Sequence, residues 1–129
     1  MFGDDFMLAL TMWREARGEG NDGMQAVGCV IRNRVKRYVS SYYHEATKKW
    51  QFSCDTAPGD PELILYPQVD DPQWQFIQGI LPGLIDGTLA DNTDGATSYF
   101  NPHVVLPTWA KSMIFIKNIG NHAFYKAAQ

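Results

Sequence analysis

The sequence predicts an α+β fold in which helices dominate and a small antiparallel sheet comes last. Apolar residues recur with helical spacing in residues 4–37 and again in 71–87. By contrast, residues 96–100 and 112–127 are rich in the aromatic and β-branched residues typical of strands. Helices followed by strands indicate an α+β arrangement. With 129 residues, 45% of them hydrophobic, the chain suits one domain, residues 1–129, with a substantial core.

The first helix is expected over residues 4–19. Asp4 and Asp5 suit its N-terminus, because acidic side chains are favourable near the positive end of the helix dipole. A glycine at position 18 or 20 can end the helix in the left-handed conformation. The apolar stripe that should face the core consists of Phe6, Ala9, Leu10, Trp13 and Ala16.

A second helix is expected to begin near Asn21 or Asp22, so that the two helices form a hairpin through a very short turn. The apolar side chains that it should bury are Met24, Val27, Val30, Ile31 and Val35. The basic side chains that it should direct away from the core are Arg32, Arg34, Lys36 and Arg37.

The middle of the chain is predicted to be less regular. Residues 50–72 contain several prolines and glycines and are expected to form a long loop held by apolar anchors. A third helix is expected over 71–87, where Pro82 should kink it or divide it into two pieces. Its buried side should carry Trp74, Ile77, Leu81 and Ile85. The sequence Asn-Ile-Gly-Asn at 118–121 is typical of a turn between two hairpin strands.

Charge and hydropathy exclude several classes of protein. The net charge of −3 and the pI near 5.5 argue against affinity based on phosphate contacts, so nucleic acid is not an expected partner. No apolar run approaches the ~20 residues that span a bilayer. The N-terminus has acids where a secretory signal has basic residues. We therefore expect no membrane insertion and no export signal, and we expect a monomer.

Basic residues are unevenly distributed, with none between Lys49 and Lys111. The favoured interpretation is a small domain with two differently charged, solvated faces. The alternative is a basic wall on the N-terminal helices, beside a cleft that receives an anionic polymer.

Few patterns indicate a nucleophile or a metal site. Cys29 and Cys54 belong to no CxxC pair and are expected to be reduced and structural, with a single bridge between them as the alternative. The sequence contains no Gly-x-Ser-x-Gly, and its histidines, at positions 44, 103 and 122, are far apart. No metal and no cofactor is therefore expected.

Carboxylates remain as candidates for chemistry, and Glu15 and Glu19 are the best placed. Four positions apart on a helix, their Cβ atoms would lie about 5–6 Å apart, and repulsion between them raises the pKa of at least one carboxyl. A glutamate that keeps its proton near neutral pH can act as a general acid. Neighbours on one helix face cannot flank a sugar bond from opposite sides, so at most one should transfer the proton. In the competing interpretation, Arg14 and Arg17 simply neutralise both acids.

Five motifs follow one another along the chain: EARGEGNDGMQAVGCVIRNRVKR from Glu15, WQFSC from Trp50, GATSYFNP from Gly95, WAKSM from Trp109 and IGNHAFYK from Ile119. In this order they resemble the SleB/CwlJ-type cell wall hydrolases, a family that includes spore-cortex lytic enzymes and phage-encoded relatives. The resemblance extends from about Met12 to Lys126. It implies a lysozyme-like fold of the lytic transglycosylase kind, with a cleft for the glycan strands of peptidoglycan.

The resemblance also implies which residues form the site. Glu15 matches the family's catalytic acid, and Glu19 is expected to support it. The other matching residues, expected to support catalysis or bind substrate, are Gln51, Phe52, Ser53, Tyr99, Asn101, Trp109 and His122.

Several of these residues have two interpretations. Tyr99 and Trp109 would either stack on sugar rings or serve as core aromatics. Asn101 would either bind an acetamido group or begin a turn before a proline. Ser53 would tune the proton affinity of the acid by a hydrogen bond. His122 is expected to fix the hairpin, or the surroundings of the acid, rather than to act as a base.

A single acid implies lytic transglycosylase chemistry. Glu15 would protonate the bond between N-acetylmuramic acid and N-acetylglucosamine and then accept a proton from the 6-hydroxyl, leaving a 1,6-anhydro end. The alternative is a hydrolytic muramidase in which Asp55, Asp60 or Glu62 activates water. A further alternative is a non-catalytic glycan-binding or structural virion module. Without an export signal, a protein made in a host cytoplasm and released by a holin, or carried in a virion, is expected.

Overall fold

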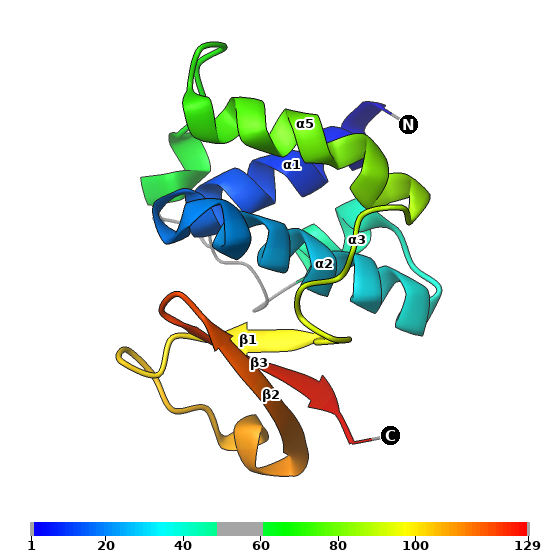
Figure 1. Cartoon of the computed structure of the whole chain (residues 1–129), viewed down its shortest axis with the longest axis vertical. Helices are drawn as coiled ribbons and strands as arrows, with labels where there is room; N and C mark the ends of the chain where they lie inside the picture. The colour runs from blue at the N-terminus through cyan, green and yellow to red at the C-terminus, as the bar shows by residue number, and fades with distance from the viewer. Residues whose placement is uncertain (1, 49–60, 129) are drawn as a thin grey trace.

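The structure, a computed structural model, describes residues 2–48 and 61–128. Its elements are α1 (Phe2–Ala16), η1 (Arg17–Glu19), α2 (Gly20–Tyr38), α3 (Tyr42–Thr47), η2 (Pro61–Ile64), α5 (Pro72–Asp86), β1 (Ser98–Phe100), η3 (Thr108–Ser112), β2 (Met113–Ile119) and β3 (His122–Ala127). The helices gather in one layer, and the sheet lies beneath α2 (Figure 1). The α+β class, mainly helical with a small C-terminal antiparallel sheet, is confirmed.

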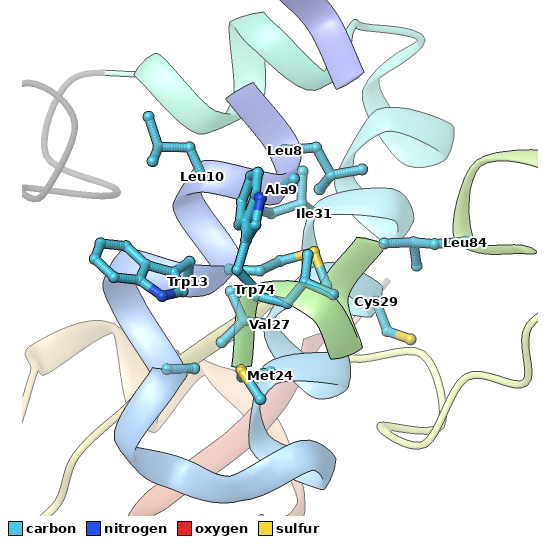
Figure 2. Close-up of a cluster of buried hydrophobic side chains, with 13 residues drawn as sticks. Leu8, Ala9, Leu10, Trp13, Met24, Val27, Cys29, Ile31, Trp74 and Leu84 are labelled. Carbon is cyan, nitrogen blue, oxygen red and sulfur yellow. The ribbon is translucent and has the colours of Figure 1, made fainter. Parts of the chain in front are cut away.

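The main hydrophobic core forms where α1, α2 and α5 meet, as Figure 2 shows. Each buried aliphatic side chain of this kind contributes about 1.5–3 kcal/mol to the stability of the fold. Phe6 was predicted to face the core but is 41% exposed, and its ring meets that of Trp74 edge-on with 6.1 Å between centroids. The completely buried side chains of this core include Leu8, Met12, Met24, Val27, Ile31, Ile77 and Leu84.

The connection between α1 and α2 is the predicted short turn, made by the three residues of η1. The prediction that the basic residues of α2 point away from the core is wrong for Arg32 and Arg34, which are both buried. Arg32 Nη1 donates to the carbonyl of Leu84 at 3.3 Å, near the end of α5. Because other elements surround α2, its guanidinium groups supply donors to carbonyls that would otherwise lack partners.

Helix α5 runs through Pro82 as one element, so of the two outcomes predicted for Pro82, a kink or a division, the division is wrong. Only the last turn follows Pro82, and few backbone hydrogen bonds of the helix therefore depend on this position. Both ends are capped. Asp71 Oδ1 accepts hydrogen bonds from the amides of Gln73 and Trp74, and Gly87, with φ of 88°, ends the helix in the left-handed conformation.

The sheet has the strand order β1-β3-β2 with both pairings antiparallel. The predicted hairpin is confirmed: β2 and β3 are joined at Gly120 and Asn121, and Ile119 pairs with His122. Strand β1 adds to the free edge of β3 and pairs Tyr99 with Phe124. This pairing places residues about 25 positions apart in the sequence side by side.

Helix α3 was not expected from the sequence. It has six residues, too few for an apolar period, and the side chain of Ser41 caps it by accepting a hydrogen bond from the amide of His44. Cys29 is a buried free thiol, as predicted, and burial, aided by the charge of Asp91, raises its pKa to about 11. Cys54 lies outside the described residues.

Within residues 2–48 and 61–128, none of the helices has the length and apolar character that crossing a lipid bilayer requires.

Candidate active site

A cleft of about 830 Å³ is lined by both the helical layer and the sheet. The helices contribute Glu15, Arg34 and Tyr38. The strands, with the loop between β1 and β2 and the end of the chain, contribute Ser98, Tyr99, Phe100, Asn101, Val104, Val105, Pro107, Trp109, Ser112, Met113, His122, Ala127 and Ala128.

The cleft brings together most of the described residues that the sequence singled out. Those lining it are Glu15, Tyr99, Asn101, Trp109 and His122. Glu19 lies behind the cleft, beside His122. The predicted residues Gln51, Phe52 and Ser53 lie outside the described part of the chain.

Glu15 stands in the last turn of α1 and is half-buried. The hydroxyl of Tyr99 donates a hydrogen bond to Glu15 Oε1 at 2.6 Å. Tyr99 is itself fixed, because it lies in β1 and its ring packs against His122 at 4.8 Å and Phe124 at 5.4 Å between centroids. The sheet therefore holds the carboxyl group of Glu15 in one orientation at the cleft wall.

Glu19 is an anchor between the helices and the hairpin. Its Oε1 accepts a hydrogen bond from the backbone amide of Asn121 at 2.8 Å, and its Oε2 accepts one from Asn121 Nδ2 at 3.2 Å. The bond from the backbone of Asn121 is the main reason why the pKa of Glu19 lies below its ordinary value of 4.5. An acid that ionises this readily is unsuited to donating a proton at neutral pH.

Gly120 permits this anchor. Its φ is 59°, in the left-handed region, and a Cβ atom there would lie 2.7 Å from Glu19 Oε1. Any larger residue would meet both backbone strain and a collision with the carboxylate. The glycine of the Ile-Gly-Asn-His motif thus serves the turn and the contact with Glu19.

Replacing Glu19 with glutamine should lower the free energy of unfolding by about 1–2 kcal/mol at neutral pH, because hydrogen bonds to a charged acceptor become bonds to a neutral one. The lowered pKa means that the carboxylate stabilises the fold above pH 4.5 and loses this effect as the pH falls through its folded value. In urea unfolding, the difference between wild type and Glu19→Gln should therefore shrink below pH 4.5. Asn121→Ala removes only the longer of the two hydrogen bonds and should lower the free energy of unfolding by less. If the difference between wild type and Glu19→Gln did not change with pH, the stabilising role of the Glu19 carboxylate would be contradicted.

His122 supports Tyr99 by packing against its ring. Its side chain is 13% exposed, and burial lowers its pKa, although the charge of Glu19 acts in the opposite direction. Its Nδ1 lies 4.0 Å from Glu19 Oε1 and has no hydrogen bond within the described chain. His122 is thus a neutral ring at physiological pH, and it packs on Tyr99.

Asn101 and Trp109 line the side of the cleft that the sheet forms. Asn101 Oδ1 accepts a hydrogen bond from the amide of His103 at 2.9 Å, so the side chain begins a turn. Its Nδ2 has no partner among the residues described and remains available to a ligand. Trp109 is 36% exposed and touches Phe100 and Tyr125 edge-on at 5.5 and 5.8 Å. It is therefore both a packed aromatic and a surface on which a ligand can lie.

The alternative catalytic carboxylates are less favourably placed or not described. Glu62 does not line the cleft, and both of its oxygens accept hydrogen bonds from the guanidinium group of Arg17, at 2.5 and 3.0 Å. Arg17 thus has a carboxylate partner other than Glu15 and Glu19. Asp55 and Asp60 lie outside the described residues. In the described segments, no three His, Cys, Asp or Glu side chains are grouped as metal ligands would be.

Arg34 and Tyr38 line the cleft but were not predicted as site residues. Both lie near the C-terminal end of α2, and the packing of that helix against α3, together with the bond from Arg34 to the carbonyl of Thr97 just before β1, brings them to the cleft. No local pattern in the sequence distinguishes them from other polar residues of an amphipathic helix.

The geometry of the cleft can be compared with known proteins. Residues 18–125 match the family model described as Cell Wall Hydrolase. The chain belongs to the cell wall hydrolase family. This confirms the resemblance found in the sequence, and the match begins three residues after Glu15.

Curated relatives of this cell wall hydrolase include the spore cortex-lytic enzyme of Halalkalibacterium halodurans, 32% identical over 123 residues, which cover 92% of this chain and 33% of the relative. The spore cortex-lytic enzyme of Bacillus cereus is 30% identical over 122 residues, which cover 93% of this chain and 43% of the relative. The chain thus spans between one third and just over two fifths of the length of these relatives.

Two solved structures are also similar. The catalytic domain of the germination-specific lytic transglycosylase SleB from Bacillus anthracis has a TM-score of 0.77 and 28% identity, covering 98% of this chain and 96% of its own. The SleB catalytic domain from Bacillus cereus has a TM-score of 0.71 and 28% identity, covering 98% and 91%. The lysozyme-like fold expected for this cell wall hydrolase is therefore confirmed.

Proposed function

We propose that this cell wall hydrolase cleaves the β-1,4 bond between N-acetylmuramic acid and N-acetylglucosamine in peptidoglycan, as a lytic transglycosylase with Glu15 as its single acid and base. The observation that carries the proposal is the position of Glu15 at the cleft wall, with Oε1 held by Tyr99 at 2.6 Å. A half-buried carboxyl group that is fixed in orientation can deliver a proton to a bound sugar.

In the first step, protonated Glu15 gives its proton to the glycosidic oxygen, and the bond to the muramic acid C1 breaks. The Tyr99 hydroxyl holds the carboxyl group through Oε1 while the proton is transferred. The positive charge that develops on the muramic ring is stabilised by the ring's own N-acetyl group, so no protein nucleophile is needed.

In the second step, Glu15 acts as a base. Now ionised, it removes the proton from the 6-hydroxyl of the same muramic acid, whose oxygen then attacks C1. The product is a 1,6-anhydromuramic end, no water is consumed, and Glu15 regains its proton. The Tyr99 hydroxyl donates to the same oxygen throughout, which keeps the carboxyl group in place during both transfers.

Substrate contacts are proposed for the sheet side of the cleft. The partly exposed face of Trp109 suits the apolar face of a sugar ring. Asn101 Nδ2 suits the carbonyl oxygen of an acetamido group. Both residues can bind substrate in this way while Asn101 keeps its turn hydrogen bond and Trp109 its ring contacts.

The proposed reaction is tested by mass spectrometry of glycan fragments released from purified peptidoglycan. Anhydro ends, which are lighter than hydrolysed ends by one water, are the expected products. Reducing ends would show that the enzyme is a muramidase and would contradict the transglycosylase step. Fragments should be absent with the Glu15→Gln protein, and their continued release would exclude Glu15 as the acid.

A further inference from the structure

A group of cationic side chains lies at one end of the cleft, around the ring of Tyr38. Tyr38 lines the cleft and is 49% exposed. Lys48 Nζ lies 5.0 Å from the centroid of its ring. Arg34, one helical turn before Tyr38 on α2, lines the same region. No step of the proposed reaction uses these residues.

Arg34 is held rigidly with part of its guanidinium group unused. Its side chain is 9% exposed; Nη1 donates to the carbonyl of Thr97 at 2.7 Å and Nε donates to Glu45 Oε1 at 3.3 Å. In the described chain, Nη2 has no hydrogen-bond acceptor. A planar donor group fixed in this way suits a carboxylate ligand, because little side-chain entropy remains to be lost on binding.

Charge at this end of the cleft is incompletely neutralised. Lys48 lies 3.9 Å from Glu45 Oε1, the same oxygen that Arg34 contacts. Glu45 is completely buried, whereas the Lys48 side chain is 41% exposed. Two cations share one buried carboxylate, so this group carries a net positive charge next to Tyr38, which lines the cleft.

The position of the group relates it to the catalytic acid. Arg34 contacts Thr97 and Glu15 contacts Tyr99, two residues further along the same extended segment. Two residues of a β-strand span roughly 7 Å. This offset places the cationic group beside the sugar units that neighbour Glu15 when a glycan strand is bound there.

The backbone sugars of peptidoglycan are uncharged, and carboxylates occur only on the muramic acid side chain. They belong either to the lactyl group itself, where no peptide is attached, or to the stem peptide linked to it. Building on the proposed function, we propose that Arg34, Tyr38 and Lys48 form a subsite that binds a carboxylate carried by a muramic acid unit. The subsite thereby makes binding depend on how the glycan strand is substituted.

Binding of soluble glycan strands tests the proposal. The proteins compared are Glu15→Gln, which leaves the strands uncut, and the same protein with Lys48→Gln or with Lys36→Gln. Lys36 is exposed and, unlike Lys48, contacts neither the Tyr38 ring nor Glu45 in the described chain, so its variant controls for loss of one positive charge. The strands carry stem peptides, or only lactyl carboxylates after amidase treatment, or lactyl methylamides without charge.

Lys48→Gln should weaken binding of carboxylate-bearing strands about two- to five-fold, as expected for one partly exposed ion pair. The preference for these strands over methylamide strands should fall by the same factor, and Lys36→Gln should leave it intact. If Lys48→Gln weakens binding only of strands that carry stem peptides, the bound group is a carboxylate of the peptide. If it also weakens binding of amidase-treated strands, the bound group is the lactyl carboxylate. If Lys48→Gln weakened binding of the uncharged methylamide strands equally, or weakened binding of no strand, the proposed subsite would be wrong. These binding measurements use proteins that do not cut. Cleavage assays on the wild-type protein therefore test the proposed reaction independently of the subsite.

Discussion

Glu15→Gln should abolish cleavage of peptidoglycan, with a loss in rate of about 10³-fold or more. Glutamine has the same size and can still accept the Tyr99 hydrogen bond at 2.6 Å, but it has no proton to give. The protein should therefore fold normally and still bind glycan strands. Clearing of a cell wall suspension measures the rate, and circular dichroism checks the fold.

Two further variants make the Glu15 result specific. Asp70→Asn converts an exposed carboxyl outside the cleft to the amide and should leave the rate unchanged. Tyr99→Phe keeps the ring packed on His122 but removes the hydroxyl, and should lower the rate about 10-fold, as expected for one hydrogen bond to a charged group. Residual activity in Glu15→Gln above that of Tyr99→Phe would mean that another residue supplies the proton.

Arg34→Met should lower the free energy of unfolding by about 3–5 kcal/mol. Arg34 pairs with Glu45 at 3.3 Å, and the side chains are only 9% and 1% exposed. Without the guanidinium group, Glu45 would be a buried carboxylate whose nearest cation is Lys48 at 3.9 Å. The carbonyl of Thr97 would also lose its donor. Urea unfolding at neutral pH provides the measurement.

The double variant Arg34→Met with Glu45→Leu distinguishes an unpaired charge from a general loss of packing. With both charges removed, no ionised group is left in the interior, and much of the lost stability should return. If the double variant were as unstable as Arg34→Met alone, the cost would come from packing or from Thr97. A matched change at the exposed Lys36 should have little effect.

The helical hairpin and the β-hairpin could be predicted because each depends on signals close together in the sequence. The apolar stripe of α1 and the turn at Gly120 are local patterns, and both are present in the structure, apart from the exposed Phe6. The sequence left open whether Pro82 would kink or divide α5, which is not divided, and the burial of Arg32 was mispredicted. Both depend on what packs around the helix, which a single periodic pattern does not contain.

The site was predictable only in part for a related reason. Spacing suggested Glu15 and Glu19 as a pair, and the family resemblance favoured Glu15 as the acid. Neither indicated that Asn121 would be the partner of Glu19, since the two residues are 102 positions apart. Such a contact becomes visible only when the hairpin is placed against the helices.

The bond between Tyr99 and Glu15 joins residues 84 positions apart. Closing so long a stretch of chain is slow compared with forming the helices, because its entropy must be lost before the contact can compensate. An N-terminal portion of the chain would thus contain the acid without the strand that orients it. During synthesis, the proposed cutting activity should consequently arise last, after the hairpin has docked on α2.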